Sequence, residues 1–326
     1  MTPDPADRVR GVLFGQAVGD ALGFGTEFLP KSAVARFYPD GLSDYAQIGD
    51  RFAPCEQWRP GDWTDDTDQL LCVLDSLLER GELDPLDVAT RLRHWGLSDG
   101  YGMGQTVYFC VHHPRFAERP FDVAQEYWES RGRRAAANGA VMRTSVLGVW
   151  QYREHDRVVA NAESVCRLTH ADPRCVGSCV AVCLAVRGLL LGTADVPALI
   201  DEAAAAVRPY HPEMQDAFAL AAQPSLEALD LDEGMNEGEE NRHGYTLKTL
   251  AAAFWSLRHA TSFEHGISAI VHEAGDADTN AAVAGSLLGA RFGFSSVPPA
   301  WIEGLVHRES LEQKAARLLE WLVGVR

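Results

Sequence analysis

Near the start of the chain, glycine recurs at every fourth position. The four glycines are Gly11, Gly15, Gly19 and Gly23. Residues four apart lie on one face of an α-helix, so the repeat predicts a helix with a groove free of side chains, which a second helix can approach closely. The same spacing marks paired membrane helices, but Asp20 and the short apolar length favour packing inside a protein core. A later segment of small residues, 281–290, has the same character.

Apolar residues follow helical periodicity nearly throughout the chain, and no stretch alternates with period two over more than a few residues. The clearest stripe is formed by Leu70, Val73, Leu74 and Leu77. Gly81 predicts the end of that helix, and Asp84 followed by Pro85 predicts the cap and first residue of the next. The sequence therefore predicts an all-α fold.

A second pair of helices is predicted farther along the chain. Its first stripe is formed by Leu247, Leu250, Phe254 and Leu257. Thr261 and Glu264 have the spacing of a capping box before the next apolar run, which begins at Phe263. No linker rich in Pro, Gly or Ser and no abrupt change of composition divides the chain. We therefore expect one domain over residues 1–326.

The charge of the chain limits its partners. Asp and Glu total 46 against 29 Lys and Arg, which leaves a formal net charge of -17. Without a basic tract to follow phosphates, nucleic acid is an unlikely partner. The N-terminus lacks a signal pattern, and the strongest apolar run, 179–186, is too short to cross a bilayer. We expect a cytoplasmic protein with no membrane partner, and we interpret the acidic segment 230–240 as a solvated loop.

Seven cysteines occur without a C-x-x-C pair, so neither a disulfide framework nor a zinc ribbon is indicated. Cys175, Cys179 and Cys183 are spaced to share one helix face, where a metal site is conceivable. The residues between them are small or apolar, and free cysteine behaves as a small buried hydrophobe. We therefore interpret these three as core residues.

Two acidic clusters carry the chemistry. The first, residues 63–68, contains Asp65 and Asp66 side by side, and the second, residues 275–280, contains Asp276 and Asp278. Each cluster precedes or begins a predicted helix, so helix capping is the alternative interpretation. Adjacent carboxylates repel one another unless solvent, helix amides or cations compensate. Two clusters, each offering at least two carboxylates and a threonine, form an all-oxygen set suited to a pair of Mg²⁺ or Mn²⁺ ions.

These clusters belong to a longer series of blocks that resembles the ADP-ribosylglycohydrolase family. The strong blocks are residues 15–23 with Glu27 and Phe28, residues 64–66 and residues 275–279. Weaker blocks follow in the expected order at residues 102–104, 138–143 and 170–173. The resemblance covers nearly the whole chain, from Gly11 to Gly293. It implies a compact orthogonal helical bundle that hydrolyses the bond between ADP-ribose and an acceptor.

The resemblance also implies roles for particular residues. The ligands of two Mg²⁺ or Mn²⁺ ions would be Thr64, Asp65, Asp66, Asp276, Asp278 and Thr279. Asp65 or Asp66 would be the general base for the attacking water, with Glu27, on a mobile loop, as the alternative. The residues expected to contact the substrate are Gly102, Gly104, Asn138, Gly139, Ala140, Met142, His170 and Tyr245. Tyr245 is a candidate for stacking on adenine, although an aromatic residue at a helix start is often simply packed.

The sequence departs from the family pattern at two positions. Ala274 replaces the first glycine of the last block, and Ala277 replaces a threonine. Loss of that hydroxyl can loosen the site, but all six expected ligands are present. Their retention favours an active enzyme over the alternative of a non-catalytic ADP-ribose binder or a crystallin-like structural protein. The partner would be an ADP-ribosylated protein or an ADP-ribose-containing small molecule, and we expect a monomer.

The acceptor is predicted to be arginine on a protein. The block at 19–28 looks most like that of the bacterial arginine-directed members, and acidic walls such as Asp99 or the 230–240 loop would attract a guanidinium group. A neutral serine hydroxyl would gain nothing from such a field. Serine-linked, nucleic-acid-linked and small-metabolite ADP-ribose are the alternatives.

Overall fold

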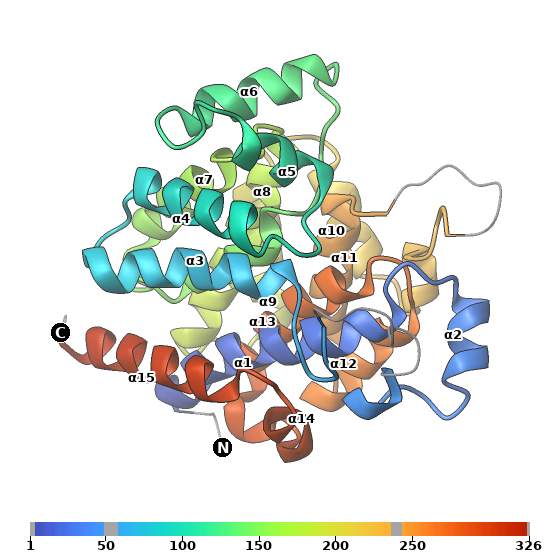
Figure 1. Cartoon of the computed structure of the whole chain (residues 1–326). Helices are drawn as coiled ribbons and strands as arrows, with labels where there is room; N and C mark the ends of the chain where they lie inside the picture. The colour runs from blue at the N-terminus through green and yellow to red at the C-terminus, as the bar shows by residue number, and fades with distance from the viewer. Residues whose placement is uncertain (1–3, 49–57, 236–242, 325–326) are drawn as a thin grey trace.

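The computed structural model describes residues 4–48, 58–235 and 243–324. Within these ranges the chain forms fifteen α-helices and short 3₁₀ turns, and the only β-type pairing is one bridge between Ala137 and Tyr245. The prediction of an all-α fold is therefore confirmed (Figure 1). The helices are α1 Pro5–Gly23, α2 Lys31–Phe37, α3 Asp65–Arg80, α4 Pro85–Ser98, α5 Gln105–His112, α6 Pro120–Ser130, α7 His155–Arg167, α8 Pro173–Leu190, α9 Val196–Val207, α10 Met214–Ala221, α11 Thr246–His259, α12 Phe263–His272, α13 Ala277–Phe292, α14 Pro299–Glu303 and α15 Arg308–Gly324.

Helices α1 and α13 lie against each other through their small residues, as the glycine repeat predicts. A Cβ atom on Gly15 would lie 2.2 Å from the carbonyl oxygen of Gly285, and one on Gly285 would lie 2.0 Å from that of Gly15. The pairing continues from Gly11 opposite Gly289 to Gly23 opposite Ala277, so the helices are antiparallel. The start of α13 therefore lies beside the end of α1, in the middle of the molecule (Figure 1).

Helix α3 begins earlier than its apolar stripe, because the acidic cluster forms its first turn. Thr64 is the N-cap, and its hydroxyl accepts a 3.4 Å hydrogen bond from the backbone N–H of Asp66. Carboxylates in a first helical turn are favoured by the unpaired amides there. The helix ends at Gly81 in the left-handed region, and Asp84 caps α4, both as predicted.

The predicted capping box at the start of α12 is wrong. The cap is Ser262, whose hydroxyl accepts a 3.1 Å hydrogen bond from the backbone N–H of His265. Ser262 has the extended backbone of a cap residue, and it directly precedes the first helical residue, Phe263. The hydroxyl of Thr261 lies instead 3.1 Å from the ring nitrogen Nδ1 of His265.

Helix α8 passes through the protein core. It has the length and hydropathy of a membrane span over residues 173–190, but 83% of that window is buried within the protein, which is the pattern of a core helix. Cys175, Cys179 and Cys183 are free and fully buried. The interpretation of these cysteines as core residues is confirmed.

The acidic segment 230–240 is described only as far as residue 235. In this part Asp232 accepts a 2.9 Å hydrogen bond from the backbone N–H of Lys31, and Glu233 forms a 2.7 Å ion pair with Lys248. These two side chains are half-buried, so they hold neighbouring elements together rather than extending into solvent. The rest of the predicted loop lies outside the described residues.

Candidate active site

The two acidic clusters, more than two hundred residues apart in the sequence, meet at the centre of the fold. Pairing of α1 with α13 and packing of α3 on both helices bring the starts of α3 and α13 together. The hydroxyl of Thr279 on α13 donates a 3.4 Å hydrogen bond to Oδ2 of Asp66 on α3. The hydroxyl oxygen of Thr64 lies 3.2 Å from the same carboxylate oxygen.

Asp20, which the sequence analysis did not assign to the site, holds the start of α3 in place. Its Oδ1 accepts hydrogen bonds from the backbone N–H and the hydroxyl of Thr64, both at 2.9 Å. Its Oδ2 accepts from the backbone N–H of Thr67 at 2.9 Å and from the hydroxyl of Thr67 at 2.6 Å. Asp20 is fully buried. A carboxylate between Gly19 and Gly23, on a stretch predicted to pack closely against another helix, was the signal that could have identified it, since buried charges need partners.

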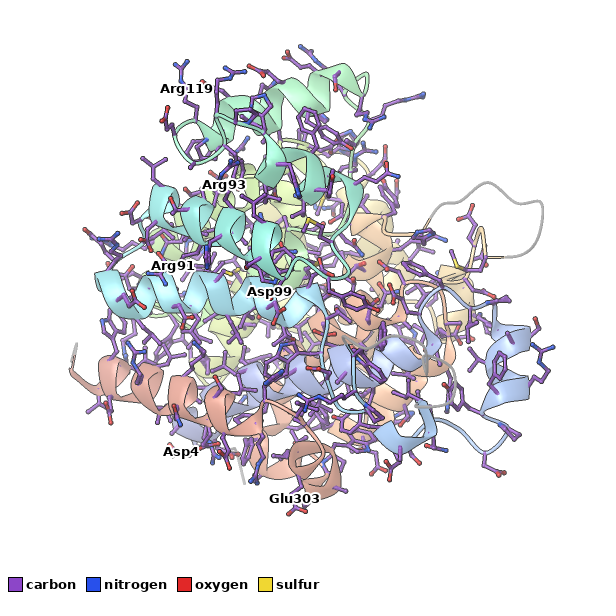
Figure 2. The ribbon with its side chains drawn as sticks, viewed as in Figure 1. Asp4, Arg91, Arg93, Asp99, Arg119 and Glu303 are labelled. Atoms are coloured by element: carbon purple, nitrogen blue, oxygen red, sulfur yellow. The ribbon has the colours of Figure 1, made fainter. Side chains whose placement is uncertain are left out.

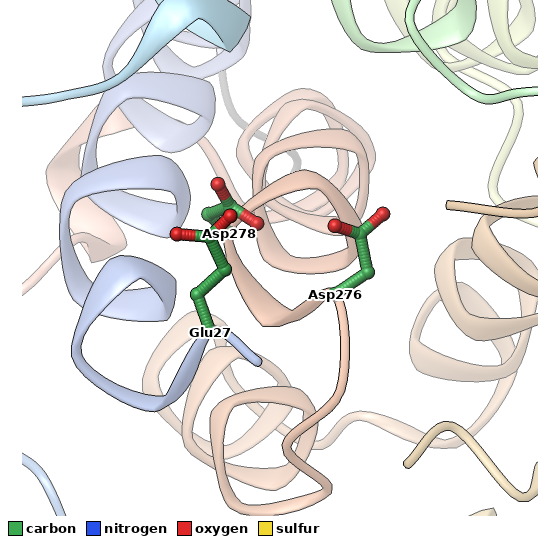
Figure 3. A group of neighbouring side chains, drawn as sticks. All are labelled: Glu27, Asp276 and Asp278. Atoms are coloured by element: carbon green, nitrogen blue, oxygen red, sulfur yellow. The ribbon is translucent and has the colours of Figure 1, made fainter. Parts of the chain in front are cut away.

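Glu27 lies with Asp276 and Asp278 in one carboxylate group (Figure 3). One oxygen from each of the three side chains lies within 4.8 Å of the others. The chain next to Glu27 is tied to the start of α13, because the N–H of Phe28 donates to the carbonyl of Gly275 at 2.7 Å and the N–H of Gly275 donates to the carbonyl of Leu29 at 3.0 Å.

Burial and mutual repulsion make these carboxyl groups difficult to ionise in the absence of a cation. Burial raises the pKa of Asp65, Asp66 and Asp278 well above its usual range, and neighbouring carboxylates raise it further. Burial likewise raises the pKa of Glu27, with Asp276 as the largest neighbouring contribution. For Asp20, burial raises the pKa to about 7 despite the hydrogen bonds that it accepts. A divalent cation would remove the repulsion that these shifts reflect.

The carboxylate group lies at one end of a cleft of about 1180 Å³. Most of the residues predicted for the site line this cleft: Glu27, Asp65, Asp66, Gly102, Gly104, Asn138, Gly139, Met142, His170, Tyr245, Asp276, Asp278 and Thr279. Ala140 does not line it, because its side chain is fully buried in the core. Thr64 does not line it either, since its hydroxyl is engaged by Asp20 and Asp66.

Two of these residues shape the cleft beside the aspartates. Gly102 has a left-handed backbone, with φ of 85°, and a Cβ there would lie 2.8 Å from Oδ1 of Asp65, so no larger residue fits without displacing that carboxylate. The side-chain amide of Asn138 donates to Oδ2 of Asp276 and to the hydroxyl of Thr249, the latter at 2.9 Å. Asn138 therefore hydrogen-bonds to the second acidic cluster and also lines the cleft.

Tyr245 lies at the cleft wall as the residue that precedes α11. Its hydroxyl donates a 2.5 Å hydrogen bond to Glu213 and accepts one of 3.4 Å from Arg174. Arg174 is in turn paired with Asp172 at 2.9 Å. The ring is thus held from its hydroxyl end, and its stacking on adenine stays a prediction.

The charge expected around the cleft is only partly present. Asp99 follows the last residue of α4 and lines a second cavity, of about 590 Å³, that also includes Thr64, so its assignment to an acidic cleft wall is wrong (Figure 2). Apart from Glu27, Asp65, Asp66, Asp276 and Asp278, the described cleft carries charges of both signs. These are Glu213, Asp216 and Glu233 together with Arg131, Arg134 and Lys248. Away from those five carboxyl groups, the described walls therefore carry no excess of negative charge that would select a cationic acceptor.

Three further residues connect to the site from the core and were not predicted: Gln69, Arg143 and Thr169. Gln69 donates a 2.8 Å hydrogen bond to Oδ2 of Asp65 and accepts one of 2.9 Å from Arg143. Arg143 stands in the block at 138–143, but nothing in the sequence indicated that its side chain lies in the core rather than along the cleft. Its full burial and its hydrogen bonds to Gln69 and Thr169 show this.

An all-α fold with a buried oxygen-rich centre in a large cleft is the architecture of a helical glycohydrolase. The family model for ADP-ribosylglycohydrolases matches residues 1–325, and the chain belongs to this family. It is an enzyme that hydrolyses glycosidic linkages of ADP-ribose.

Relatives with related names cover most of the chain. It is 28% identical to the ADP-ribosyl-[dinitrogen reductase] glycohydrolase of Rhodospirillum rubrum, over 97% of each chain. It is 26% identical to the ADP-ribosylarginine hydrolase Tri1 of Serratia proteamaculans, over 96% of this chain and 79% of the relative. A solved structure of an ADP-ribosylglycohydrolase-related protein complex superposes with a TM-score of 0.71 at 28% identity, covering 98% of this chain and 99% of the other. The helical arrangement is thus that of the family.

Proposed function

We propose that this enzyme releases ADP-ribose from arginine side chains of modified proteins, and that it requires two Mg²⁺ or Mn²⁺ ions. The observation that carries the proposal is the convergence of two acidic helix starts on one buried point at the end of the cleft. The residues that would hold the ions are Asp65, Asp66, Asp276, Asp278 and Thr279, with Thr64 as a sixth ligand if its hydroxyl oxygen, which lies beside Asp66, turns toward the ion.

The residues present fit such ions. All of the proposed donors are hard oxygens, which Mg²⁺ and Mn²⁺ prefer. Oδ1 of Asp66 and Oδ1 of Asp278 are buried and have no hydrogen-bond partner among the described residues. A buried oxygen without a partner is costly, and a cation would supply that partner. Glu27 lies close enough to Asp276 and Asp278 to share an ion with them.

The bound ions would supply positive charge that orients the ribose hydroxyls and stabilises the negative charge that develops as the glycosidic bond breaks. The chain itself supplies the proton acceptor. Asp65 or Asp66 takes a proton from the attacking water as the glycosidic bond breaks, with Glu27 as the alternative base. The wall that includes Gly102, Asn138 and Gly139 positions the ADP-ribose so that its anomeric carbon faces these carboxylates.

Arginine is proposed as the acceptor because two relatives over most of the chain, from Serratia proteamaculans and Pseudomonas putida, are named ADP-ribosylarginine hydrolases. The charge of the cleft no longer supports this choice, since Asp99 lies elsewhere and the described rim is mixed. The proposed preference therefore rests on family membership.

The test is direct. Purified protein is incubated with peptides ADP-ribosylated on arginine or on serine and with an ADP-ribosylated oligonucleotide, each with Mg²⁺ or with EDTA, and free ADP-ribose is measured. Release from the arginine peptide alone, and only with metal, is the expected result. Release that persists after verified removal of metal contradicts the metal dependence, and equal or faster release from serine contradicts the acceptor.

A further inference from the structure

Arg143 is a fully buried cation at the back of the candidate site. Four of its N–H groups donate hydrogen bonds, and none of the acceptors is a carboxylate. They are Oε1 of Gln69 at 2.9 Å, the carbonyl of Gly139 at 3.1 Å, the carbonyl of Val165 at 3.2 Å and the hydroxyl of Thr169 at 2.6 Å. Burying a guanidinium group in the core without a charged partner costs free energy, so we expect Arg143 to have a role beyond packing.

The acceptors of Arg143 belong to three separate segments of the chain, each of which also contacts or contains a residue of the cleft. Through Gln69 it reaches Asp65, and through the carbonyl of Gly139 it holds the cleft wall. Through Thr169 it reaches His170, since the hydroxyl of Thr169 lies 2.7 Å from Nδ1 of that ring. One side chain thus sets the relative positions of a carboxylate, a wall and a histidine.

The chain of contacts also favours one position for the proton of His170. Arginine can only donate, so the hydroxyl oxygen of Thr169 accepts from Arg143. That leaves the single hydroxyl proton of Thr169 free to be donated to Nδ1 of His170. A neutral ring whose Nδ1 accepts carries its proton on Nε2. With the opposite tautomer, the hydroxyl of Thr169 would accept from both Arg143 and Nδ1, and its own buried proton would have no acceptor among the hydrogen bonds of the described residues.

Nε2 of His170 is buried and has no partner among the described residues, although the side chain lines the cleft. A Cβ added to Gly139 would lie 3.4 Å from this nitrogen, so the absence of a side chain there leaves space beside the buried ring. Burial and the charge of Arg143 hold the pKa of His170 well below its usual range, which is consistent with a neutral ring.

We propose that Arg143 is a positioning residue that, through Thr169, holds His170 as the neutral tautomer with its proton on Nε2, as a hydrogen-bond donor for an oxygen atom of bound ADP-ribose. The part of this inference that concerns contact with ADP-ribose rests on the proposed function, whereas the part that concerns the tautomer of His170 does not. Arg143 and Thr169 do not touch the ligand. They set the direction in which His170 can donate.

The first experiment uses the wild-type protein labelled with ¹⁵N-histidine. Long-range ¹H–¹⁵N spectra distinguish a nitrogen that carries a proton from one that does not, and the loss of one signal set in His170→Gln identifies the ring. We expect a protonated Nε2 and an unprotonated Nδ1 at neutral pH, and a shift of the Nε2 proton when ADP-ribose is added. A proton on Nδ1, or a charged ring, overturns the inference. Absence of any ADP-ribose effect on Nε2 overturns its role as a donor to the ligand.

The second experiment measures ADP-ribose affinity by calorimetry in matched variants. Thr169→Val removes the hydroxyl while keeping the shape, and we expect about tenfold weaker binding together with loss of the single tautomer. Thr169→Ser keeps the hydroxyl and should restore both. Ser256→Ala removes a buried hydroxyl of α11 that bonds only within its helix, and should leave both unchanged. If folded Thr169→Val binds ADP-ribose with normal affinity and keeps the single tautomer of His170, the proposed relay from Arg143 through Thr169 to His170 is contradicted. Failure of Thr169→Ser to recover both properties contradicts it as well.

The two proposals fail in different ways. If wild-type protein binds ADP-ribose but releases none from any acceptor, the proposed function fails while the tautomer and its contact stand. If it releases ADP-ribose but carries the proton of His170 on Nδ1, the relay fails while the function stands.

Discussion

At the scale of single residues, the candidate site consists of buried carboxyl groups and the hydrogen-bond donors that hold them in position. Asp20 shows this most directly, because its two oxygens accept four hydrogen bonds from Thr64 and Thr67. Loss of that carboxylate would leave the backbone N–H groups and hydroxyls of both threonines without these four hydrogen bonds. Outer partners of this kind orient the groups that bind a metal.

Asp20→Asn should therefore impair the proposed metal centre without abolishing the fold. The amide nitrogen of asparagine cannot accept, so either the Thr64 pair or the Thr67 pair of hydrogen bonds is lost. We expect Mg²⁺ affinity, measured by calorimetry, to fall by roughly 10- to 100-fold, with helical circular dichroism retained. Thr67→Ser, which keeps the hydroxyl, serves as the control. Unchanged metal affinity in Asp20→Asn would show that Asp20 supports only the fold.

Asp66→Asn and Asp278→Asn test the proposed ligands themselves. Each replaces one carboxylate oxygen by an amide at nearly constant volume, so we expect turnover to fall by at least about a hundredfold. Cys179→Ala, a core truncation on α8, should cost stability by about 1–2 kcal/mol while leaving turnover unchanged. Near-normal turnover in both aspartate variants would reject the assignment.

At the scale of elements, the site depends on how closely α1 and α13 approach. The backbone of each helix occupies the space that a Cβ on the other would take, as at Gly15 and Gly285. Since Gly23 faces Ala277 at the end of this contact, a change in helix spacing moves the start of α13 and its aspartates.

Gly15→Ala should therefore destabilise the protein and reduce its activity together. The new Cβ would meet the Gly285 carbonyl at 2.2 Å, so the helices must separate, and we expect a loss of about 1–3 kcal/mol or more in the free energy of unfolding by urea. Gly324→Ala, where the Cβ meets nothing within 4 Å, is the matched control and should be neutral. Wild-type stability in Gly15→Ala would mean that the two helices do not pack this closely.

At the scale of the whole molecule, the buried carboxyl groups make stability depend on pH and metal. A group whose pKa is raised in the folded protein binds more protons there than in the unfolded chain, so its contribution is lost as pH rises through the folded value. Burial raises the pKa of Asp20 to about 7 and shifts those of Asp65, Asp66 and Asp278 in the same direction. His170 opposes this, because its lowered pKa costs stability as pH falls below its usual value, but it is one group against several.

In EDTA, the midpoint temperature of thermal unfolding should therefore decrease as the pH is raised from 5 to 8. Mg²⁺ at millimolar concentration should raise the midpoint more at pH 8 than at pH 5, because ionised carboxylates bind the cation and only the native state binds it tightly. Thermal scans by circular dichroism at both pH values, with and without Mg²⁺, measure this. A larger effect of Mg²⁺ at pH 5, or none at either pH, would argue against a carboxylate metal centre.

The sequence by itself determined the helical class, several helix ends and the small-residue groove on α1 that another helix can approach closely. These follow from local rules, because periodicity, capping residues and glycine spacing act over a few neighbouring positions. Even locally it failed at Thr261, where two adjacent hydroxyl residues competed for one cap position. Most of the predicted cleft residues were found through family resemblance, since their motifs are short and continuous.

Only the tertiary structure decided what the intervening residues do. Asp20 and Arg143 stand in recognised blocks, but their partners lie at distant positions, such as Thr67 and Thr169, and no local pattern pairs them. The same holds for charge: Asp99 was expected at the cleft, yet the direction in which α4 ends places it on a second cavity. A buried group can be satisfied by any acceptor that folding brings within reach, and the sequence does not specify which one that is.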